Sequence, residues 1–210
     1  MTRVKICGIR RVEDAVLASS LGADAIGFIF WPRSPRFIDP FAARAIVRAL
    51  PPFVTAVGVF VDQPAAFVIG VAQLLGLGAI QLHGSEVLAA YAGASARIIK
   101  SVAVVEGGDC MPVVRDVPLN ATVLLDAHDP IKRGGTGRAI DWKQAAAAAT
   151  VRPVILSGGL NADNVGDAIA AVSPYAIDIS SGVESEPGIK DAGKLRTLFA
   201  ALAQREARTI

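Results

Sequence analysis

Residues 153–182, PVILSGGLNADNVGDAIAAVSPYAIDISSG, contain one complete unit of alternating secondary structure. An apolar run at 153–157 predicts a buried strand, an Ala/Val/Ile segment at 162–172 predicts a helix, and a second apolar run at 175–180 predicts another strand. Strand and helix alternate in this way in parallel α/β folds. The stretch therefore predicts a βαβ unit.

The same alternation extends over the rest of the chain. Apolar runs that predict strands recur about every 25 residues, at 3–8, 24–30, 54–61, 79–82, 97–104, 121–126, 153–157 and 175–180. The gaps predict helices at 12–21, 40–50, 64–75, 85–92, 110–117, 141–149, 162–172 and 191–206. Eight such units predict a single α/β domain over residues 1–210, a compact (β/α)8 barrel of the TIM type, because this fold can shrink to about 200 residues.

The sequence also allows two other interpretations. An open doubly wound sheet shares the alternation, but Cys7-Gly8-Ile9-Arg10 after the first strand lacks the Gly-rich turn that often marks that fold. Residues 63–85 carry no Asp, Glu, Lys or Arg and are long enough to span a bilayer. Glycines and glutamines interrupt this segment, so a helix that begins near Pro64 and runs into a strand is the better interpretation.

Composition narrows the possible partners and compartment. Hydrophobic residues make up 52% of the chain and charged residues 19%, a balance typical of a folded protein. The net charge is only +2 and the basic residues are scattered, so neither nucleic acid nor a membrane is an expected partner. Cys7 and Cys110 match no zinc spacing and follow no secretory signal, which favours a reduced cytoplasmic protein.

Polar residues gather at the predicted strand ends. In a barrel of this kind the active site lies at the carboxyl ends of the strands, and the last two strands end in Ser157-Gly158-Gly159 and Ser180-Ser181-Gly182. Glycine lets backbone N–H groups approach an oxyanion closely, so Gly158, Gly159, Ser181 and Gly182 are the candidate phosphate-binding residues. Pro187-Gly188-Ile189 is expected to begin a short extra helix beside them.

Cys7 and Asp126 end the first and sixth predicted strands. Alternation places Cys7 on the same face as Lys5, toward the mouth of the barrel, although a free cysteine is often only a small buried side chain. Asp126 is either functional, or a carboxylate that caps a loop or pairs with Lys132 or Arg133. A base and an acid at the mouth can move protons between adjacent carbons of a sugar phosphate. As a base, Cys7 would benefit from a local positive potential.

Other residues near the mouth have two possible roles each. The segment between Asp126 and Asp141 contains Gly134-Gly135-Thr136-Gly137, either a lid over a substrate or a surface loop. Arg36 is either a carboxylate-binding residue or solvated. His83 either packs in its loop or contacts a substrate. Lys5 and Asp178 are expected to form an internal ion pair between the first and last strands.

Eight motifs, taken in order, resemble the phosphoribosylanthranilate isomerase family over almost the whole chain: KICGI at 5–9, GFIFWPRSPRFI at 27–38, VGVFVD at 57–62, QLHG at 81–84, LLDA at 124–127, GGTGRAIDW at 134–142, SGGL at 157–160 and DISSGVESEPGIKD at 178–191. The resemblance implies an Amadori rearrangement of a small phosphorylated substrate in tryptophan biosynthesis, without metal or cofactor. It implies that Cys7 is the general base and Asp126 the general acid. Arg36 would meet the anthranilate carboxylate, and Gly135 and Asp178 are further candidate substrate-binding residues.

The resemblance has small departures and leaves competitors. Ile140 and Trp31 stand where an aromatic residue and a tyrosine are expected. The related histidine-pathway isomerases have an aspartate as the strand-one base and a phosphate loop in each half-barrel, whereas this chain has Cys7 and phosphate-type loops only in its second half. A barrel that binds a sugar phosphate or a partner protein without catalysis is the alternative from another class. A monomer or a homodimer is expected.

Overall fold

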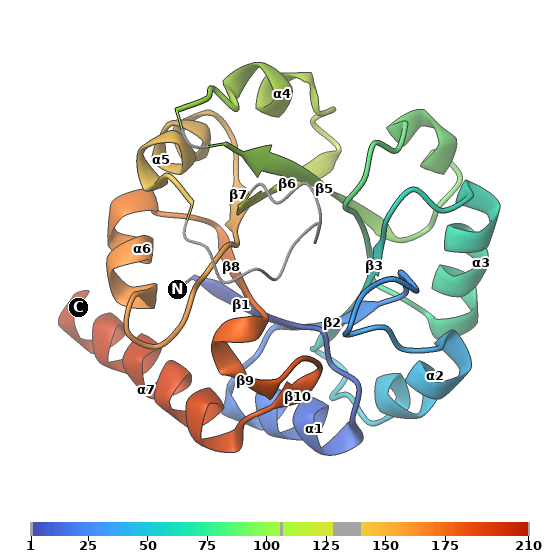
Figure 1. The fold of residues 1–210 in the computed structure, drawn as a ribbon, viewed down its shortest axis with the longest axis horizontal. Coiled ribbons are helices and arrows are strands. Elements are labelled where there is room, and N and C mark those ends of the chain that lie inside the picture. The colour runs from blue at the N-terminus through green and yellow to red at the C-terminus, as the bar shows by residue number, and fades with distance from the viewer. Residues whose placement is uncertain (1, 106, 128–139, 210) are drawn as a thin grey trace.

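The computed structural model describes residues 2–105, 107–127 and 140–209. Its centre is a closed barrel of parallel strands, each hydrogen-bonded to the next along the chain, with β8 closing onto β1 (Figure 1). The strands are β1 (Arg3–Cys7), β2 (Ala25–Ile29), β3 (Thr55–Phe60), β4 (Ala79–Leu82), β5 (Arg97–Val104), β6 (Ala121–Ala127), β7 (Val154–Leu156) and β8 (Ala176–Ile179). Every predicted strand is present, and the predicted (β/α)8 fold is confirmed.

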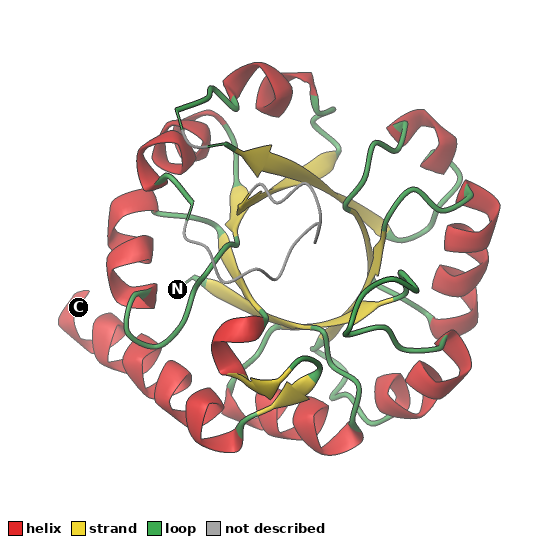
Figure 2. Ribbon diagram, in the orientation of Figure 1, coloured by secondary structure: helices red, strands yellow, loops and turns green. Residues whose placement is uncertain are grey.

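The helices form a ring outside the strands, as Figure 2 shows. They are α1 (Val12–Leu21), α2 (Pro40–Arg48), α3 (Ala65–Leu75), α4 (Met111–Asp116), α5 (Trp142–Val151), α6 (Val165–Val172) and α7 (Ala192–Thr209). The uncharged segment 63–85 forms α3 and β4, as predicted. Within the described ranges, no helix combines the length and apolar character that crossing a bilayer requires.

The predicted helix at 85–92 is wrong in type and extent. Only a 3-10 turn, η1 (Leu88–Tyr91), forms there. The carboxylate of Glu86 accepts hydrogen bonds from the backbone N–H groups of Asp62 and Gly84, which ties the chain into a turn before a helix can begin. Too few residues then remain before Gly93 for a stable α-helix.

The predicted extra helix at Pro187 is also wrong. The 3-10 turn η2 (Ser181–Val183) directly follows β8, and the segment after it is a hairpin of β9 (Glu184–Glu186) and β10 (Ile189–Lys190). Gly188 has a φ of 84°, in the left-handed region that favours glycine and interrupts a helix. Its N–H group donates to Glu184 Oε1 over 3.2 Å, which closes the turn of the hairpin.

Side chains along each strand point alternately into the barrel and out toward the helices, and the inward-facing ones show where a site can lie. A small inner core of the barrel contains six buried residues, Val57, Ala79, Ile99, Leu124, Ile155 and Ala176. Two residues farther along five of these strands, the inward positions are occupied by Gln81, Ser101, Asp126, Ser157 and Asp178. The barrel is therefore apolar in its middle and polar at the carboxyl ends of its strands.

Candidate active site

A cavity of about 960 Å³ opens at the carboxyl ends of the strands. This volume is within the usual range for small-molecule sites. Its lining brings together several residues singled out from the sequence, namely Cys7, Arg36, His83, Asp126 and Asp178. The candidate base and the candidate acid thus face one cavity, from β1 and β6.

Lys5 lies against two residues that line this cavity and makes a short contact with each. Its Nζ atom donates to Asp178 Oδ2 and to Gln81 Oε1, each over 2.8 Å. Both partners are buried, and the predicted ion pair between Lys5 and Asp178 is confirmed. Burial works against the charge on Lys5, but the carboxylate of Asp178 helps to raise the pKa of the ammonium group above its ordinary value. Lys5 is therefore a fixed positive charge beside Cys7.

Gly27 makes room for Cys7 and Lys5. It pairs with Cys7 in the register between β1 and β2. A Cβ atom at this position would lie 2.7 Å from Cys7 Sγ and 3.0 Å from Lys5 Cε. Any side chain here would push the thiol and the ammonium group out of place, so the sequence needs glycine at this point.

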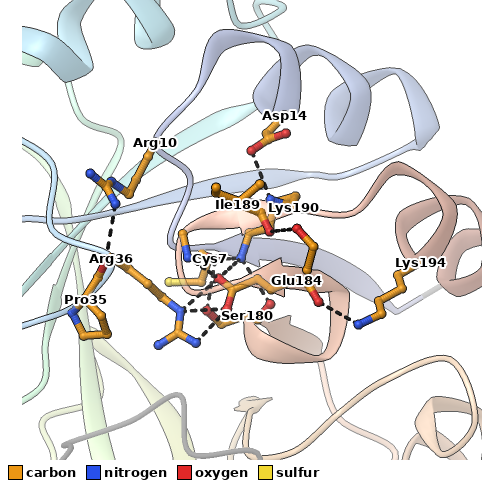
Figure 3. Close-up of polar contacts among 12 residues, drawn as sticks. Cys7, Arg10, Asp14, Pro35, Arg36, Ser180, Glu184, Ile189, Lys190 and Lys194 are labelled. Carbon is orange, nitrogen blue, oxygen red and sulfur yellow. Dashed lines mark hydrogen bonds and ion pairs between the residues drawn. The ribbon is translucent and has the colours of Figure 1, made fainter.

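A second group of charges, shown in Figure 3, lies beside Cys7. Lys190 Nζ donates to the backbone oxygen of Cys7 over 2.6 Å and to Glu184 Oε1 over 2.8 Å. Glu184 in turn accepts a forked pair from Arg36, from Nε over 2.9 Å and from Nη2 over 2.7 Å. Although burial opposes its charge, these two cations hold the pKa of Glu184 below its ordinary value. The hairpin thus ties the Arg36 loop to the end of β1.

The environment of Cys7 differs in part from the expectation. The expected positive charges are present, because Lys5 and Lys190 both favour the thiolate. Burial outweighs them, however, and together with the negative charge of Asp178 it raises the pKa of the Cys7 thiol above its ordinary value. Cys7 is consequently a strong base that is mostly protonated at neutral pH.

Arg36 is not solvated; only 7% of its surface is exposed. The Nε and Nη2 atoms are used by Glu184, so a substrate carboxylate cannot pair with that edge of the guanidinium group. Nη1 has no hydrogen bond to any described residue, and Arg36 lines the cavity. The edge formed by Nη1 and Nη2 is the one that remains for a planar anion.

On the other side of the cavity, His83 contacts Asp126. The distance from His83 Nε2 to Asp126 Oδ2 is 3.2 Å, and the distance from His83 Nδ1 to Gln81 Nε2 is 3.3 Å. His83 also lines the cavity, so it combines a packing contact with a position near a ligand. Asp126 is buried, and its partner in the described part of the chain is a histidine.

Comparison with known proteins shows the family of the chain. A family model described as N-(5'-phosphoribosyl)anthranilate (PRA) isomerase matches residues 4–201. The chain belongs to this family. A relative from Citrifermentans bemidjiense, named N-(5'-phosphoribosyl)anthranilate isomerase, is 48% identical over 200 residues, which cover 95% of this chain and 96% of the relative.

Solved structures agree. A phosphoribosyl anthranilate isomerase from Thermus thermophilus is 45% identical, with a TM-score of 0.87 over 97% of this chain and 99% of that one. Another phosphoribosyl anthranilate isomerase, in complex with reduced 1-(o-carboxyphenylamino)-1-deoxyribulose 5-phosphate, is 37% identical, with a TM-score of 0.84 over 97% of this chain and 100% of that one. This member of the PRA isomerase family is therefore an isomerase.

The two candidate phosphate loops of this PRA isomerase family member lie side by side. Gly158 and Gly159 have φ values of 91° and 65°, and their N–H groups have no hydrogen-bond partner among the described residues. A Cβ atom on Gly182 would clash with the backbone oxygen of Leu160, so the second loop packs directly on the first. The cavity itself is lined by the neighbouring Ser157 and Ser180, which places the glycines at its edge.

Some expectations fall on residues 128–139, outside the described part of the chain. These are the candidate substrate-binding residue Gly135, the possible partners Lys132 and Arg133 of Asp126, and the lid. Of the two departures from the PRA isomerase motifs, Trp31 lines the cavity and Ile140 is buried.

Three site residues were missed at the level of sequence: Gln81, Glu184 and Lys190. Glu184 and Lys190 lie in the hairpin of β9 and β10, which was not among the predicted elements. Gln81 has the one usable signal, because alternation places a polar residue on the inner face of a predicted strand two positions before His83.

Proposed function

We propose that Cys7 and Asp126 carry out the proton transfers of a phosphoribosylanthranilate isomerase in this chain. The reaction is the Amadori rearrangement of N-(5-phosphoribosyl)anthranilate to 1-(2-carboxyphenylamino)-1-deoxyribulose 5-phosphate, in tryptophan biosynthesis. The observation that supports the assignment most strongly is that the two side chains line one cavity from different strands.

The acid step opens the sugar ring. Asp126 gives a proton to the ring oxygen, the bond from that oxygen to C1 breaks, and the lone pair of the anthranilate nitrogen forms a C1–N double bond. The buried position of Asp126 beside His83 supports this role, because the N–H of an imidazole can stabilise the carboxylate that remains.

The base step forms the product. Cys7, as the thiolate, removes the proton from C2, and the electrons of that C–H bond neutralise the C1–N iminium to give an enolamine. Transfer of the C2 hydroxyl proton to C1 then gives the ketone. Lys5 supports this step because its positive charge favours the thiolate, although the thiol starts with a raised pKa.

Three groups are proposed to bind the substrate. The N–H groups of Gly158 and Gly159, with those of Ser181 and Gly182, would hold the phosphate. The free edge of Arg36 would pair with the anthranilate carboxylate. Oδ1 of Asp178 is buried and without a hydrogen bond in the described structure, so it is suited to accept one from a sugar hydroxyl.

The test is turnover by the purified wild-type chain of freshly generated phosphoribosylanthranilate, followed by the loss of anthranilate fluorescence. The histidine-pathway aminoaldose, a larger ligand with two phosphates, is the matched comparison. We expect turnover of the first substrate and at least 100-fold lower kcat/KM for the second, since the described phosphate-type loops lie together after β7 and β8. No turnover of the first substrate, with tight binding of the reduced product, would identify a barrel that only binds.

A further inference from the structure

A chain of buried polar contacts crosses the floor of the cavity, from the base side to the acid side. It runs from Asp178 to Lys5, from Lys5 to Gln81, from Gln81 to His83, and from His83 to Asp126. The first end of this chain of contacts lies beside Cys7, and the other end is Asp126 itself. The direction of every hydrogen bond in it can be worked out from the kind of group at each position.

The first link fixes the orientation of the Gln81 amide. An ammonium group has donors and no acceptor. Since Lys5 Nζ lies 2.8 Å from the Gln81 side chain, the atom facing it must be the carbonyl oxygen Oε1. Gln81 is 2% exposed, so water cannot compensate for the reverse orientation, which would place an NH2 group against an ammonium group.

The second link fixes the tautomer of His83. With Oε1 turned to Lys5, the NH2 group of Gln81 faces His83 Nδ1 over 3.3 Å. An NH2 group only donates, so Nδ1 must accept and carries no hydrogen. The ring hydrogen of His83 is therefore on Nε2.

The third link acts on the proposed acid. His83 Nε2 lies 3.2 Å from Asp126 Oδ2, and the Ser101 hydroxyl oxygen lies 3.5 Å from the same nitrogen. The N–H group on Nε2 donates to Oδ2, the nearer oxygen, which must then be an acceptor. Because the carbonyl oxygen of a carboxylic acid is a better acceptor than its hydroxyl oxygen, this contact favours the proton of Asp126 on Oδ1, which has no hydrogen bond to a described residue.

We propose that Gln81 is a positioning residue: relayed through His83, its amide directs the proton of Asp126 onto Oδ1 for delivery to the substrate. The kinetic part of this inference rests on the proposed role of Asp126 as the acid. The tautomer of His83 does not, because it follows from the contacts of the chain without substrate.

Gln81→Glu tests the direction of the chain with almost no change in shape. One carboxylate oxygen would still accept from Lys5, but the other would face His83 Nδ1 and would draw the hydrogen to that nitrogen. Nε2 would become an acceptor, and the proton of Asp126 would turn to His83 and away from the substrate. We expect kcat to fall by about 10- to 100-fold, with KM changed by less than about threefold.

Gln81→Met is the matched control. It keeps the volume of the side chain but removes both hydrogen bonds, so His83 is left free to choose its tautomer. We expect a loss in kcat of less than about tenfold. If Gln81 had only a structural role, Gln81→Met would lose more kcat than Gln81→Glu, because Gln81→Glu keeps the contact with Lys5 and Gln81→Met loses it. Greater damage from Gln81→Met than from Gln81→Glu would overturn the proposal.

The tautomer can be measured directly by NMR of the chain labelled with ¹⁵N-histidine, because ring nitrogens with and without hydrogen have different chemical shifts. The chain has two histidines, and the signals of His83 are those lost in His83→Gln. We expect hydrogen on Nε2 in the wild type and on Nδ1 in Gln81→Glu. Hydrogen on Nδ1 in the wild type would overturn the inference, whatever Asp126 does in the reaction.

Discussion

Two buried cations, one at each end of the barrel, make similar contacts with different consequences. Arg152, just before β7, donates to the backbone oxygens of Val114, Val117, Pro118 and Ala121, and so ties the end of α4 to the start of β6. Lys190, at the opposite end, donates to the backbone oxygens of Cys7 and Ser180 and to the carboxylate of Glu184.

The difference lies in what each cation touches next. Arg152 contacts backbone oxygens in the loops at the amino-terminal ends of the strands. A residue at this face of a barrel is expected to stabilise the fold. Lys190 is joined through Glu184 to Arg36, which lines the cavity, and it lies against the strand that carries Cys7. Burial of a cation alone therefore does not indicate a functional role. Such a role is indicated when a partner of the cation also contacts a residue of the cavity, as Glu184 contacts Arg36.

Of the substitutions that test this difference, removal of Lys190 should have the largest effect. Lys190→Met leaves the buried carboxylate of Glu184 with Arg36 and the N–H group of Gly188, and it removes a positive charge that favours the Cys7 thiolate. We expect kcat/KM to fall by at least about 100-fold and the free energy of unfolding to fall by about 3 kcal/mol. Fluorescence turnover and urea unfolding measure the two effects. Full activity in this variant would show that Lys190, like Arg152, only stabilises the fold.

Gly182→Ala should disturb only the phosphate side of the cavity. The new Cβ atom would meet the backbone oxygen of Leu160, so the loops after β7 and β8 must separate. We expect KM to rise by about tenfold, with a smaller change in kcat. Gly166→Ala in α6 is the control, because its Cβ atom meets nothing within 4 Å and should leave KM unchanged. Equal KM values for the two variants would refute the phosphate assignment.

The pH dependence of kcat/KM tests whether Cys7 is the base. Because burial raises the pKa of Cys7, the fraction of thiolate, and with it kcat/KM, should keep rising with pH beyond the ordinary thiol range. Lys190→Gln should move this rise to still higher pH, since it removes a charge that lowers the pKa of Cys7. A profile that levels off in the acid range would exclude Cys7 as the base in the free enzyme.

The smallest effect on activity is expected for Arg152→Met. The substitution removes four hydrogen bonds to backbone oxygens, so the free energy of unfolding should fall by about 2 to 4 kcal/mol. Turnover measured well below the unfolding temperature should stay within about twofold of the wild type. A large loss of kcat/KM in the folded variant would show that the two ends of the barrel are coupled.

Features of this structure that depend on neighbouring residues are predicted from the sequence, whereas most contacts between distant residues are not. The apolar runs predict all eight strands, because a strand that is buried on both faces is a continuous run of apolar residues in the sequence. Alternation and the expected neighbouring of the first and last strands also predict the pair of Lys5 and Asp178. The contact of Lys190 with Cys7 joins positions 183 residues apart through a hairpin, and no local pattern predicts it. The turn at Gly188 is not predicted for a different reason: it depends on a hydrogen bond to the Glu184 carboxylate, which apolar periodicity does not reveal.

The most direct test of the central claim compares turnover of phosphoribosylanthranilate by the wild type, Cys7→Ala and Asp126→Ala, with binding of the reduced product as the control for an intact cavity. The account predicts that each variant loses about 10²- to 10⁴-fold in kcat while still binding the reduced product. Turnover near the wild-type level in either variant would contradict the assignment of that residue as base or acid.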